Sequence, residues 1–440
     1  MAVSQIQQTP IGQLRPHPAN AHTHSKKQIA LIARSIEQFG FIVPIVVDEN
    51  GVILAGHGRW LAAKKRGLKF VSAVVASGLS DAEQRAYVLA DNRLTEKAGW
   101  DRPALAMELQ LLAPLLAEAG LDIELTGFET SEIDALMGDL SDPDQDPADE
   151  VPEITKNPIS RKGDLWLLGP HRLLCGDARQ RPDFRKLMGS ERASMVFTDP
   201  PYNTRIASVQ GRGKIKHREF AVASGEMSRE KFTKFLSNCL SLAAQHSVDG
   251  SIHFVCMDWR HIGEMLAASE EVYTEFKNLI VWAKTNAGQG TFYKSQHELI
   301  FAFKNGDSPH INNFELGQHG RNRSNVWTYA GINTFRAGRM EDLRAHPTSK
   351  PVGLIADAMR DCSRRGNIVL DCFIGAGTTI LAAERVGRCG FGIEIDPRYV
   401  DAAICRWQQF TKRDTILEAT GQTFNDVAKQ RASQRDRRPK

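Results

Sequence analysis

The feature that most constrains the fold is a strand, a glycine turn and a helix that follow one another late in the chain. Ile368 to Asp371 is an apolar run typical of a buried strand, and it leads directly into the glycine-containing segment 372–379. A helical segment, 380–386, follows with Gly387 as a suitable stop, and a second apolar run occupies 390–396. Because glycine lets the backbone approach a ligand closely, this pattern predicts an α/β fold with a ligand site at the turn.

Carboxylates end the second of these strands. Glu394 and Asp396 lie roughly 20 residues past the glycines, which suits an acid that accepts hydrogen bonds from ribose hydroxyls. The turn has the pattern F-x-G-x-G, without the full dinucleotide-binding fingerprint and without the lysine of a phosphate loop. By itself, the turn is therefore a weak signal for a nucleotide-type cofactor.

A second rigid turn, Asp199-Pro200-Pro201-Tyr202, follows the apolar run 195–197. Two prolines fix φ and remove two backbone donors, so the turn presents its carbonyl oxygens outward. A carboxylate, a carbonyl and an aromatic ring then lie at the carboxyl end of a strand, where ligands bind in open α/β sheets. The amino nitrogen of a nucleobase could donate to Asp199 and to the Pro200 carbonyl while Tyr202 stacks on the base. The same turn can also simply end a strand.

The two motifs resemble those of DNA amino-methyltransferases that use S-adenosylmethionine, in which D-P-P-Y is the catalytic motif and F-x-G-x-G the cofactor motif. Their order, with the catalytic motif first, resembles the permuted β group of that family. The H-P-T-S-K-P segment at 346–351 resembles the H-P-T-x-K-P segment of these enzymes, and the stretches 163–169, 171–177 and 295–301 also match. The resemblance spans roughly residues 161–412.

The resemblance implies a Rossmann-like methyltransferase domain with a mixed sheet, and it assigns site residues. The catalytic residues are Asp199, Pro200, Pro201 and Tyr202. Phe373, Gly375 and Gly377 shape the cofactor site, Glu394 takes the ribose hydroxyls, Asp177 contacts the adenine, and Lys350 and Pro351 lie near the methionine end. The full set of implied cofactor-binding residues is Asp177, Lys350, Pro351, Asp371, Phe373, Gly375, Gly377, Thr378 and Glu394. No metal is required, and no His/Cys cluster has ligand spacing.

The implied activity is sequence-specific methylation of adenine N6 in double-stranded DNA, with the target base flipped out and stacked on Tyr202. Cytosine N4 is the nearest alternative, because both amino groups offer the same donor geometry. A different alternative is a DNA-binding partition or regulatory protein in which the methyltransferase domain is vestigial. The residues Asp199, Tyr202, Gly375 and Glu394 speak against that alternative, since all are intact.

Residues 1–98 are predicted to form a separate small α+β domain. The pattern predicts helices at 25–40, 60–66 and 81–89, a hairpin of strands 44–47 and 52–54, and a strand at 70–76. These features resemble the ParB N-terminal domain, which shares its fold with sulfiredoxins. Gly56-His57-Gly58-Arg59 matches the G-x-x-R that faces phosphates in that fold, and Asp91-Asn92-Arg93 lies where the family has another polar motif.

This N-terminal resemblance implies a phosphate or anion site at Gly56, Arg59, Asn92 and Arg93, since an arginine at a glycine-opened helix N-terminus suits an anion. Sulfiredoxin chemistry needs a cysteine where this chain has His57 and Gly58, so that activity is not expected. A docking or DNA-binding module without catalysis is the alternative to a nucleotide site.

The remaining segments complete the domain organisation. Residues 99–138 are predicted to be helical, with a leucine stripe at Leu105, Leu109, Leu112 and Leu116 that indicates core or interface. Residues 139–160 are predicted to be an acidic, proline-rich, solvated linker, and 413–440 a basic tail that is disordered from 429 onward.

A target-recognition insert is expected at about 204–345. Apolar runs at 252–255 and 278–282 predict further strands, with 297–303 as hairpin partner of the latter. Basic residues in the loops of the insert suit contacts to DNA phosphates and base edges. The candidate DNA-binding residues are Arg205, Arg212, Lys214, Arg321, Arg323, Arg336 and Arg339.

Composition fits this organisation. A chain of 440 residues predicts two to three domains, and its net charge of +4 permits nucleic-acid binding without requiring it. We expect no membrane span, because no stretch approaches ~18 uninterrupted apolar residues, and no signal peptide, because residues 1–18 have no apolar core. Seven cysteines without a C-x-x-C pair predict reduced thiols and a cytoplasmic, nucleoid-associated protein. The expected partner is double-stranded DNA, and the sequence leaves room for a homodimer.

Overall fold

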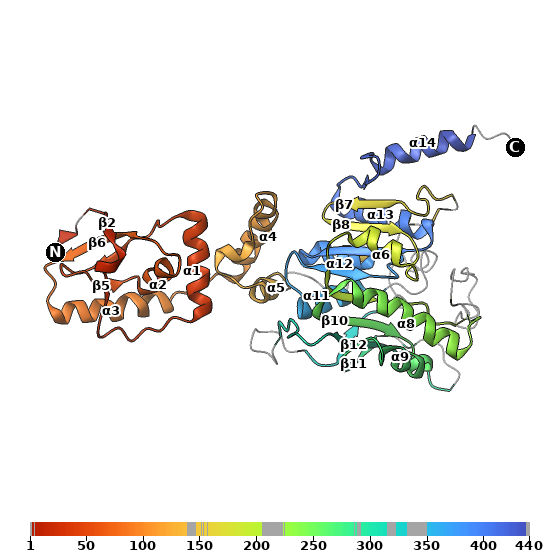
Figure 1. Ribbon diagram of the computed structural model, residues 1–440, viewed down its shortest axis with the longest axis horizontal. Helices are drawn as coiled ribbons and strands as arrows, with labels where there is room; N and C mark the ends of the chain where they lie inside the picture. Colours follow the sequence, from red (N-terminus) through yellow and green to blue (C-terminus); the bar gives the residue numbers. More distant parts are fainter. Residues whose placement is uncertain are drawn as a thin grey trace. The chain divides into compact units, whose positions relative to one another are not determined.

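The computed structural model describes residues 2–3, 5–138, 147–150, 152, 154–155, 157–204, 223, 225–285, 287, 292–314, 323–331 and 350–436. The chain divides into two compact units, Met1–Leu140 and Ser141–Lys440 (Figure 1). The division falls at the start of the segment that we predicted to be a linker.

The N-terminal unit combines a small sheet with helices. Its elements are β1 (Ala2–Val3), β2 (Gln7–Pro10), η1 (Ile11–Gln13), β3 (Arg15–Pro16), α1 (Lys26–Phe39), β4 (Ile45–Val47), β5 (Val52–Ala55), α2 (His57–Lys65), β6 (Phe70–Ser77), α3 (Asp81–Glu96), α4 (Arg102–Glu118), η2 (Ile123–Thr126) and α5 (Thr130–Gly138). Among the residues described, the strand order is β1-β6-β4-β5-β3, and β2 also pairs with β6. The predicted hairpin is the antiparallel pair β4 and β5.

Local chemistry sets the limits of these helices. The Ser25 side chain accepts a hydrogen bond from the Gln28 amide and so caps α1, which ends at Gly40 with a φ of 81°. Helices α4 and α5 bury a small cluster of their own that includes Leu109, Ile123 and Ile133. The predicted leucine stripe thus contributes to a core, through its buried member Leu109.

The C-terminal unit is built around one large mixed sheet. Its elements are η3 (Pro147–Asp149), β7 (Leu165–Leu168), β8 (His171–Cys175), α6 (Arg181–Met188), β9 (Ala193–Thr198), α8 (Arg229–Gln245), β10 (Ser247–Met257), η4 (Trp259–His261), α9 (Ile262–Ser269), β11 (Glu275–Lys284), β12 (His297–Asn305), β13 (Val326–Tyr329), α11 (Val352–Cys362), β14 (Ile368–Asp371), α12 (Thr378–Val386), β15 (Cys389–Glu394), α13 (Pro397–Thr411), β16 (Ile416–Leu417) and α14 (Phe424–Asp436). Ten strands are described, in the order β13-β11-β12-β10-β9-β14-β15-β8-β7-β16.

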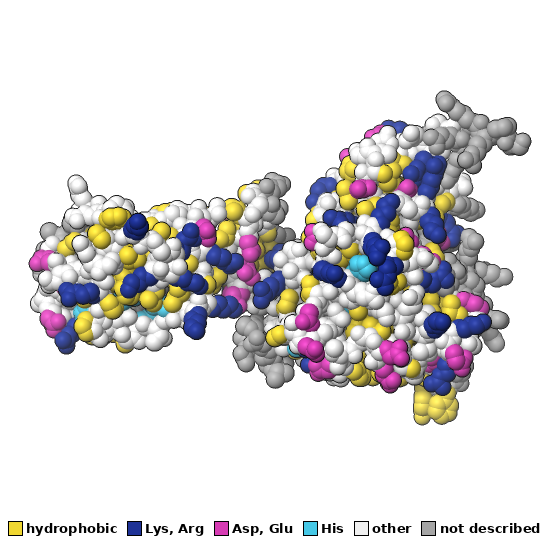
Figure 2. Space-filling model, viewed as in Figure 1, with side chains coloured by type: hydrophobic (Ala, Val, Ile, Leu, Met, Phe, Trp, Pro, Cys, Tyr) yellow, Lys and Arg dark blue, Asp and Glu magenta, His cyan; other side chains and the backbone are white. Residues whose placement is uncertain are grey.

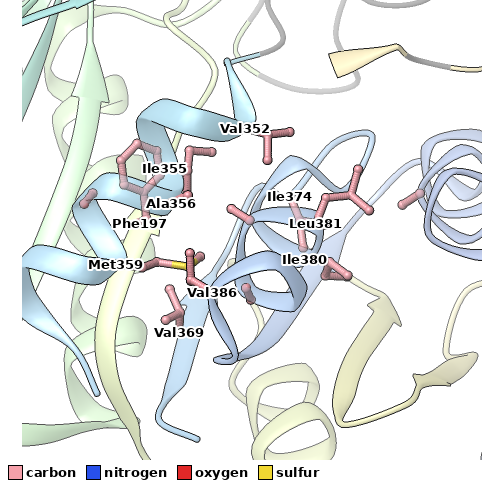
Figure 3. Close-up of a cluster of buried hydrophobic side chains, with 14 of the residues drawn as sticks. Phe197, Val352, Ile355, Ala356, Met359, Val369, Ile374, Ile380, Leu381 and Val386 are labelled. Atoms are coloured by element: carbon pink, nitrogen blue, oxygen red, sulfur yellow. The ribbon is translucent and has the colours of Figure 1, made fainter. Parts of the chain in front are cut away.

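Helices cover both faces of this sheet (Figure 1). Because side chains alternate along a strand, Met195 and Phe197 of β9 join the core on the side of α11, α12 and α13, whereas Val196 joins the core on the side of α6, α8 and α9. Figure 3 shows Ile355 and Met359 of α11 close to Phe197 in the first of these cores. Strands β10, β9, β14, β15 and β8 are mutually parallel, so their carboxyl ends share one edge.

Two predictions about segments outside the sheet were wrong. Part of the supposed solvated linker packs on the C-terminal unit: the Asp149 carboxylate accepts from the Val352 amide at the start of α11 at 2.8 Å, and the Ala148 carbonyl accepts from buried Arg406. The supposed disordered tail is helical to Asp436, because Arg431 of α14 pairs with Asp164. Acidic residues thus cap a helix and pair with an arginine in contacts that composition alone did not reveal.

Other properties of the described chain bear on its class. Every cysteine of the sequence lies in the described part, and each is a free thiol. Among the helices that the structure describes, none is both long enough and apolar enough to span a membrane. On the face drawn in Figure 2, basic and acidic side chains are interspersed over both units.

Candidate active site

The two sequence motifs meet because β9 and β14 are neighbours in the sheet. The strands run parallel, with Val369 opposite Met195 and Leu370 opposite Val196. The D-P-P-Y turn after β9 and the glycine turn after β14 therefore leave the same edge side by side. Connections that bring distant segments together at such an edge create the crevice where α/β proteins bind ligands.

The D-P-P-Y turn is held by side-chain hydrogen bonds at its acidic end. The Tyr202 hydroxyl donates to Asp199 Oδ1 at 2.6 Å, and the Lys350 ammonium donates to Asp199 Oδ2 at 2.5 Å. The Lys350 Nζ also lies 3.3 Å from the Tyr202 hydroxyl and 5.6 Å from the centre of its ring. Lys350, which we predicted at the methionine end of the cofactor, thus contacts the catalytic motif directly.

The carboxylate of Glu298 and the ammonium of Lys284 extend this cluster, and neither was assigned a role from the sequence. Glu298 Oε2 lies 3.0 Å from Lys350 Nζ, and its Oε1 accepts from Lys284 Nζ at 2.5 Å. Glu298 lies in the stretch 295–301 that carried the family resemblance, and Lys284 ends the apolar run of β11. We name Asp199, Tyr202, Lys284, Glu298 and Lys350 the catalytic cluster.

Burial and pairing set the protonation of the catalytic cluster. Burial raises the pKa of Asp199, and the Lys350 ammonium opposes that rise. Burial also acts to raise the pKa of Glu298, but Lys350 and Lys284 outweigh it and lower this pKa to about 2. Burial acts to lower the pKa of Lys350, yet Asp199 and Glu298 raise it above its usual value. Lys350 is therefore a permanent cation between two carboxylates.

A threonine joins the catalytic turn to the cofactor turn. The Thr198 hydroxyl donates to Asp371 Oδ1 at 3.0 Å and accepts from the Cys372 amide at 3.2 Å. The Thr379 hydroxyl donates to the other oxygen of Asp371 at 2.6 Å. Burial raises the pKa of Asp371 to about 6 against these hydrogen bonds. Asp371 therefore links β9, β14 and α12 through these hydrogen bonds. The roles of Thr198 and Thr379 were missed from the sequence.

The glycine turn closes over the acid at the end of β15. Glu394 Oε2 accepts from the Gly375 amide at 2.9 Å, and its Oε1 accepts from the Asp396 amide at 2.8 Å. Gly377 caps α12 with a φ of 83°, and a Cβ there would lie 2.7 Å from that of Ala403, so no other residue fits without strain. Burial raises the pKa of Glu394 to about 7, and the nearby carboxylates of Asp396 and Asp371 add to the rise.

Other residues implied as cofactor contacts have intramolecular partners. Arg179 donates to both carboxylate oxygens of Asp177, at distances from 2.7 to 3.1 Å. The Thr378 hydroxyl accepts from Arg406 at 3.0 Å, which ties α12 to α13. Pro351 caps the N-terminus of α11, and the half-buried ring of Phe373 lies 6.0 Å from that of Phe235. The cofactor roles of these residues remain predictions.

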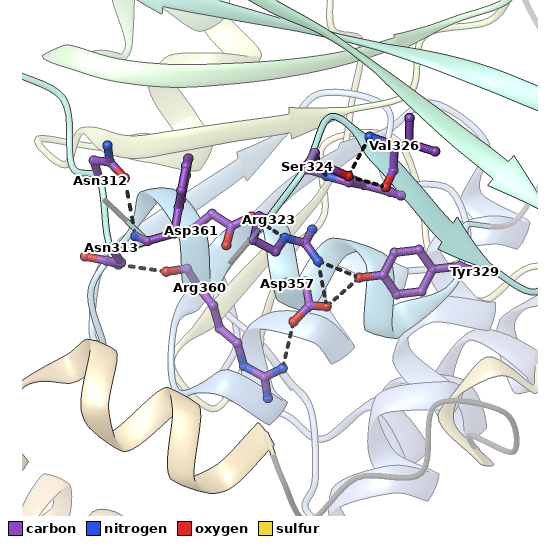
Figure 4. A network of polar contacts seen from close by, with 11 residues as sticks. Asn312, Asn313, Arg323, Ser324, Val326, Tyr329, Asp357, Arg360 and Asp361 are labelled. Atoms are coloured by element: carbon purple, nitrogen blue, oxygen red, sulfur yellow. Dashed lines mark hydrogen bonds and ion pairs between the residues drawn. The ribbon is translucent and has the colours of Figure 1, made fainter. Parts of the chain in front are cut away.

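One of the candidate DNA-binding residues lies in the described part of the chain, and its guanidinium is held inside the protein. Arg323 Nε donates to Asp361 at 3.1 Å, and Nη1 lies 3.3 Å from Asp357 and 3.2 Å from the Tyr329 hydroxyl (Figure 4). Arg323 thereby joins the insert to α11, an arrangement unlike that of a free phosphate contact. The other candidates, Arg205, Arg212, Lys214, Arg321, Arg336 and Arg339, lie outside the described residues.

The N-terminal site is less complete than the sequence suggested. Gly56 caps α2 with a φ of 97°, and the half-buried Arg59 donates to the Pro44 carbonyl at 3.3 Å, while its Nε has no hydrogen-bond partner among the described residues. Burial lowers the pKa of Arg59, and the acid that opposes this is Asp91. Asn92 instead bonds the Val88 carbonyl within α3, and Arg93 pairs with Glu96 on the surface.

Three known families match successive parts of the chain. Residues 1–93 match the ParB N-terminal domain, residues 103–162 the ParB-methyltransferase HTH domain, and residues 193–404 the N6/N4 family described as DNA methylase. The chain therefore contains an N6/N4 DNA methylase domain together with a ParB N-terminal domain and a ParB-methyltransferase HTH domain. The helices α4 and α5 that we predicted as a helical extension fall within the HTH match, which also runs through the supposed linker.

Relatives resemble the two units separately. The Type II methyltransferase M.HpaI of Haemophilus parainfluenzae is 25% identical over 276 residues, which are 58% of this chain and 81% of the relative. The ParB-like nuclease domain-containing protein YnaK of Escherichia coli K12 is 43% identical over 76 residues, which are 17% of this chain and 87% of YnaK. The crystal structure of an M1.HpyAVI–SAM complex is 20% identical, covers 53% of this chain and 97% of its own, and has a TM-score of 0.41.

Proposed function

We propose that the protein transfers a methyl group from S-adenosylmethionine to the exocyclic amino group of a base in double-stranded DNA. Adenine N6 is the proposed target, and cytosine N4 is the alternative. The observation that carries this proposal is the hydrogen-bonded pair of Asp199 and Tyr202 at the carboxyl end of β9, next to the glycine turn that follows β14.

The residues of the glycine turn fit the proposed cofactor. Each carboxylate oxygen of Glu394 accepts one backbone amide, and a carboxylate oxygen has a second lone pair that suits a ribose hydroxyl. Burial is the main cause of the raised pKa values of Glu394 and Asp371, and neighbouring carboxylates add to the rise, so a cationic group bound nearby would favour their ionised forms. S-adenosylmethionine supplies a methyl group on a positively charged sulfonium when bound.

The chain contributes positioning and electrostatics to the transfer. As the amino nitrogen of the base gains positive charge, an acceptor fixed beside it stabilises that charge, and Asp199 is such an acceptor. The Lys350 ammonium, held also by Glu298, favours the ionised form of Asp199 against the effect of burial and fixes the direction of its carboxylate. The half-buried ring of Tyr202, fixed by its bond to Asp199, is available to stack on a base that has left the helix.

Two parts of the proposal concern contacts beyond the catalytic turn. Sequence specificity is assigned to the insert, with the basic residues named above, apart from Arg323, as the proposed DNA contacts. A phosphate-bearing ligand, such as a nucleotide, is proposed at the N-terminal site, because the Arg59 guanidinium lies one turn into a glycine-capped helix and its Nε has no hydrogen-bond partner in the described part of the chain. A fluorescent ribonucleoside triphosphate titrated against the wild type and Arg59→Ala tests this part.

Long-read methylome sequencing of DNA from cells that express the protein tests the proposed function. We expect one modified motif, and the modified base distinguishes adenine N6 from cytosine N4. The variant Asp199→Ala should lose the modification while calorimetry shows nearly unchanged S-adenosylmethionine affinity, because Asp199 belongs to the catalytic turn. A wild-type protein that binds no S-adenosylmethionine supports the regulatory alternative, in which the methyltransferase domain is vestigial.

A further inference from the structure

Two neighbouring aromatic side chains are almost completely exposed. Phe292 is 88% exposed and Tyr293 is 80% exposed, which is more than any other large hydrophobic side chain in the described part of the chain. Their ring centres lie 4.5 Å apart at 66°, so the two rings contact each other edge to face. Single exposed apolar residues are ordinary on protein surfaces, but an adjacent pair of large aromatic rings that are both almost fully exposed points to a binding surface.

The topology places this aromatic pair beside the catalytic cluster. The pair lies between β11 and β12, where the Lys284 amide donates to the Gln296 carbonyl at 2.8 Å and closes the hairpin. Lys284 and Glu298, on either side of that closing bond, belong to the catalytic cluster. Because a chain extends at most ~3.5 Å per residue, Phe292 lies within about 14 Å of Gln296. The exposed rings therefore belong to the same hairpin end as Lys284 and Glu298, a short stretch of chain away from the catalytic cluster.

We propose that Phe292 and Tyr293 form a wedge that enters the DNA duplex and stacks in the gap left by the target base. This inference rests on the proposed function. Removing a base from the stack costs its stacking energy and leaves an apolar gap, and inserted apolar side chains are a general means of compensating for unstacking. Aromatic rings stack on bases of any sequence, so the wedge assists flipping without selecting the target. The exposed Lys294 next to the pair suits a phosphate contact.

The test uses the full chain with Phe292→Ala and Tyr293→Ala combined, on two duplexes that contain the motif found by methylome sequencing. In one duplex the target base is paired, and in the other it faces an abasic residue, so little pairing remains to be broken. We expect kcat/KM on the paired duplex to fall by about 10- to 100-fold, the loss of roughly one base–aromatic stack. On the abasic duplex the double variant should approach the wild-type value.

A matched control and a second readout separate the wedge from a structural role. Phe410→Ala removes a ring that is 43% exposed at the end of α13, a helix that begins at the site edge and runs away from it, and it should change neither activity. With 2-aminopurine in the target position, the wild type should raise fluorescence on binding and the double variant should raise it less.

Three outcomes contradict the inference in different ways. Equal losses on both duplexes mean that the double variant damages the catalytic cluster, and they overturn the wedge. Unchanged activity on the paired duplex also overturns it and leaves the aromatic pair as a contact for another protein. A wild type without activity on either duplex removes the proposed function and the wedge with it.

Discussion

Both units of the molecule start a helix with a glycine in the left-handed region, Gly56 directly after β5 and Gly377 after the segment 372–376 that follows β14, but the charges around the two helix N-termini are opposite. Gly56 begins α2 with a φ of 97°, and Gly377 begins α12 with a φ of 83°. Near the first lies the Arg59 guanidinium, whereas near the second lie the carboxylates of Asp371 and Glu394.

The comparison shows that a left-handed glycine at a helix N-terminus does not by itself determine which ligand binds there. A helix N-terminus offers unpaired amides to any acceptor. With arginine nearby, the N-terminal site favours a phosphate. In the C-terminal unit, Glu394 already takes the Gly375 amide, so the ligand there must bring hydroxyl donors and positive charge. Substitutions in one site at a time can therefore test the ligand preference expected for each site.

The largest effect is expected from removing the cation of the catalytic cluster. Lys350→Met leaves Asp199 and Glu298 without their shared counter-charge, so Asp199 takes up a proton and loses its role as an acceptor. Leaving a buried ion-pair partner uncompensated costs about 3–5 kcal/mol of folding free energy. Because the acceptor is lost as well, the rate of methyl transfer should fall by at least about 100-fold. Transfer of label from S-adenosylmethionine to DNA measures the rate.

The matched variants for this prediction are Lys284→Met and Arg59→Met. Lys284 contacts Glu298 but not Asp199 in the described contacts, so its loss should reduce the rate less. Arg59 belongs to the other unit and should leave methyl transfer unchanged. Transfer by Lys350→Met at the wild-type rate would show that Asp199 does not depend on Lys350.

Replacing each of the two glycines by alanine should lower the free energy of unfolding by different amounts. Gly377→Ala forces a left-handed alanine against the Cβ of Ala403 at 2.7 Å, which costs about 3 kcal/mol from strain and overpacking combined. Gly56→Ala meets the movable tip of the Arg59 side chain at 2.9 Å, so mainly the backbone cost of about 1–2 kcal/mol applies. Denaturant unfolding measures the loss of stability, and hydrogen exchange shows in which of the two units the loss occurs. Equal losses would contradict the packing difference.

The smallest effect is expected from pH. Glu394 has a pKa raised to about 7 and must be ionised to accept two ribose hydroxyls, so the affinity for S-adenosylmethionine should fall as the pH drops below 7, by about tenfold per unit. Glu394→Gln should bind S-adenosylmethionine weakly and without this pH dependence.

At the N-terminal site, burial and the nearby His24 lower the pKa of His57 to about 4, so His57 should not change nucleotide affinity between pH 6 and 8. Calorimetry at several pH values measures both, and a flat S-adenosylmethionine profile for the wild type would contradict the role of Glu394.

The elements were largely predictable from local patterns, and the contacts between them were not. The helix capped by Ser25, the hairpin of β4 and β5 and the strands β9 and β14 follow from periodicity, caps and turn residues. Thr198 was missed because its partner, Asp371, is distant in sequence. The packing of Asp149 on α11 was missed because acidic, proline-rich composition is also typical of solvated linkers.

The sequence by itself determined the α/β class, the order of the two motifs and the position of the turn that we predict to be catalytic, because prolines, glycines and apolar runs act over a few residues. Only the tertiary structure decided that Lys350 before α11 contacts Asp199, that Glu298 of β12 contacts Lys350, and that Lys284 of β11 contacts Glu298. The antiparallel hairpin of β11 and β12 returns the chain to the carboxyl edge of β9, and burial there requires each charge to find a partner of opposite sign. That pairing depends on sheet order, which no local pattern encodes.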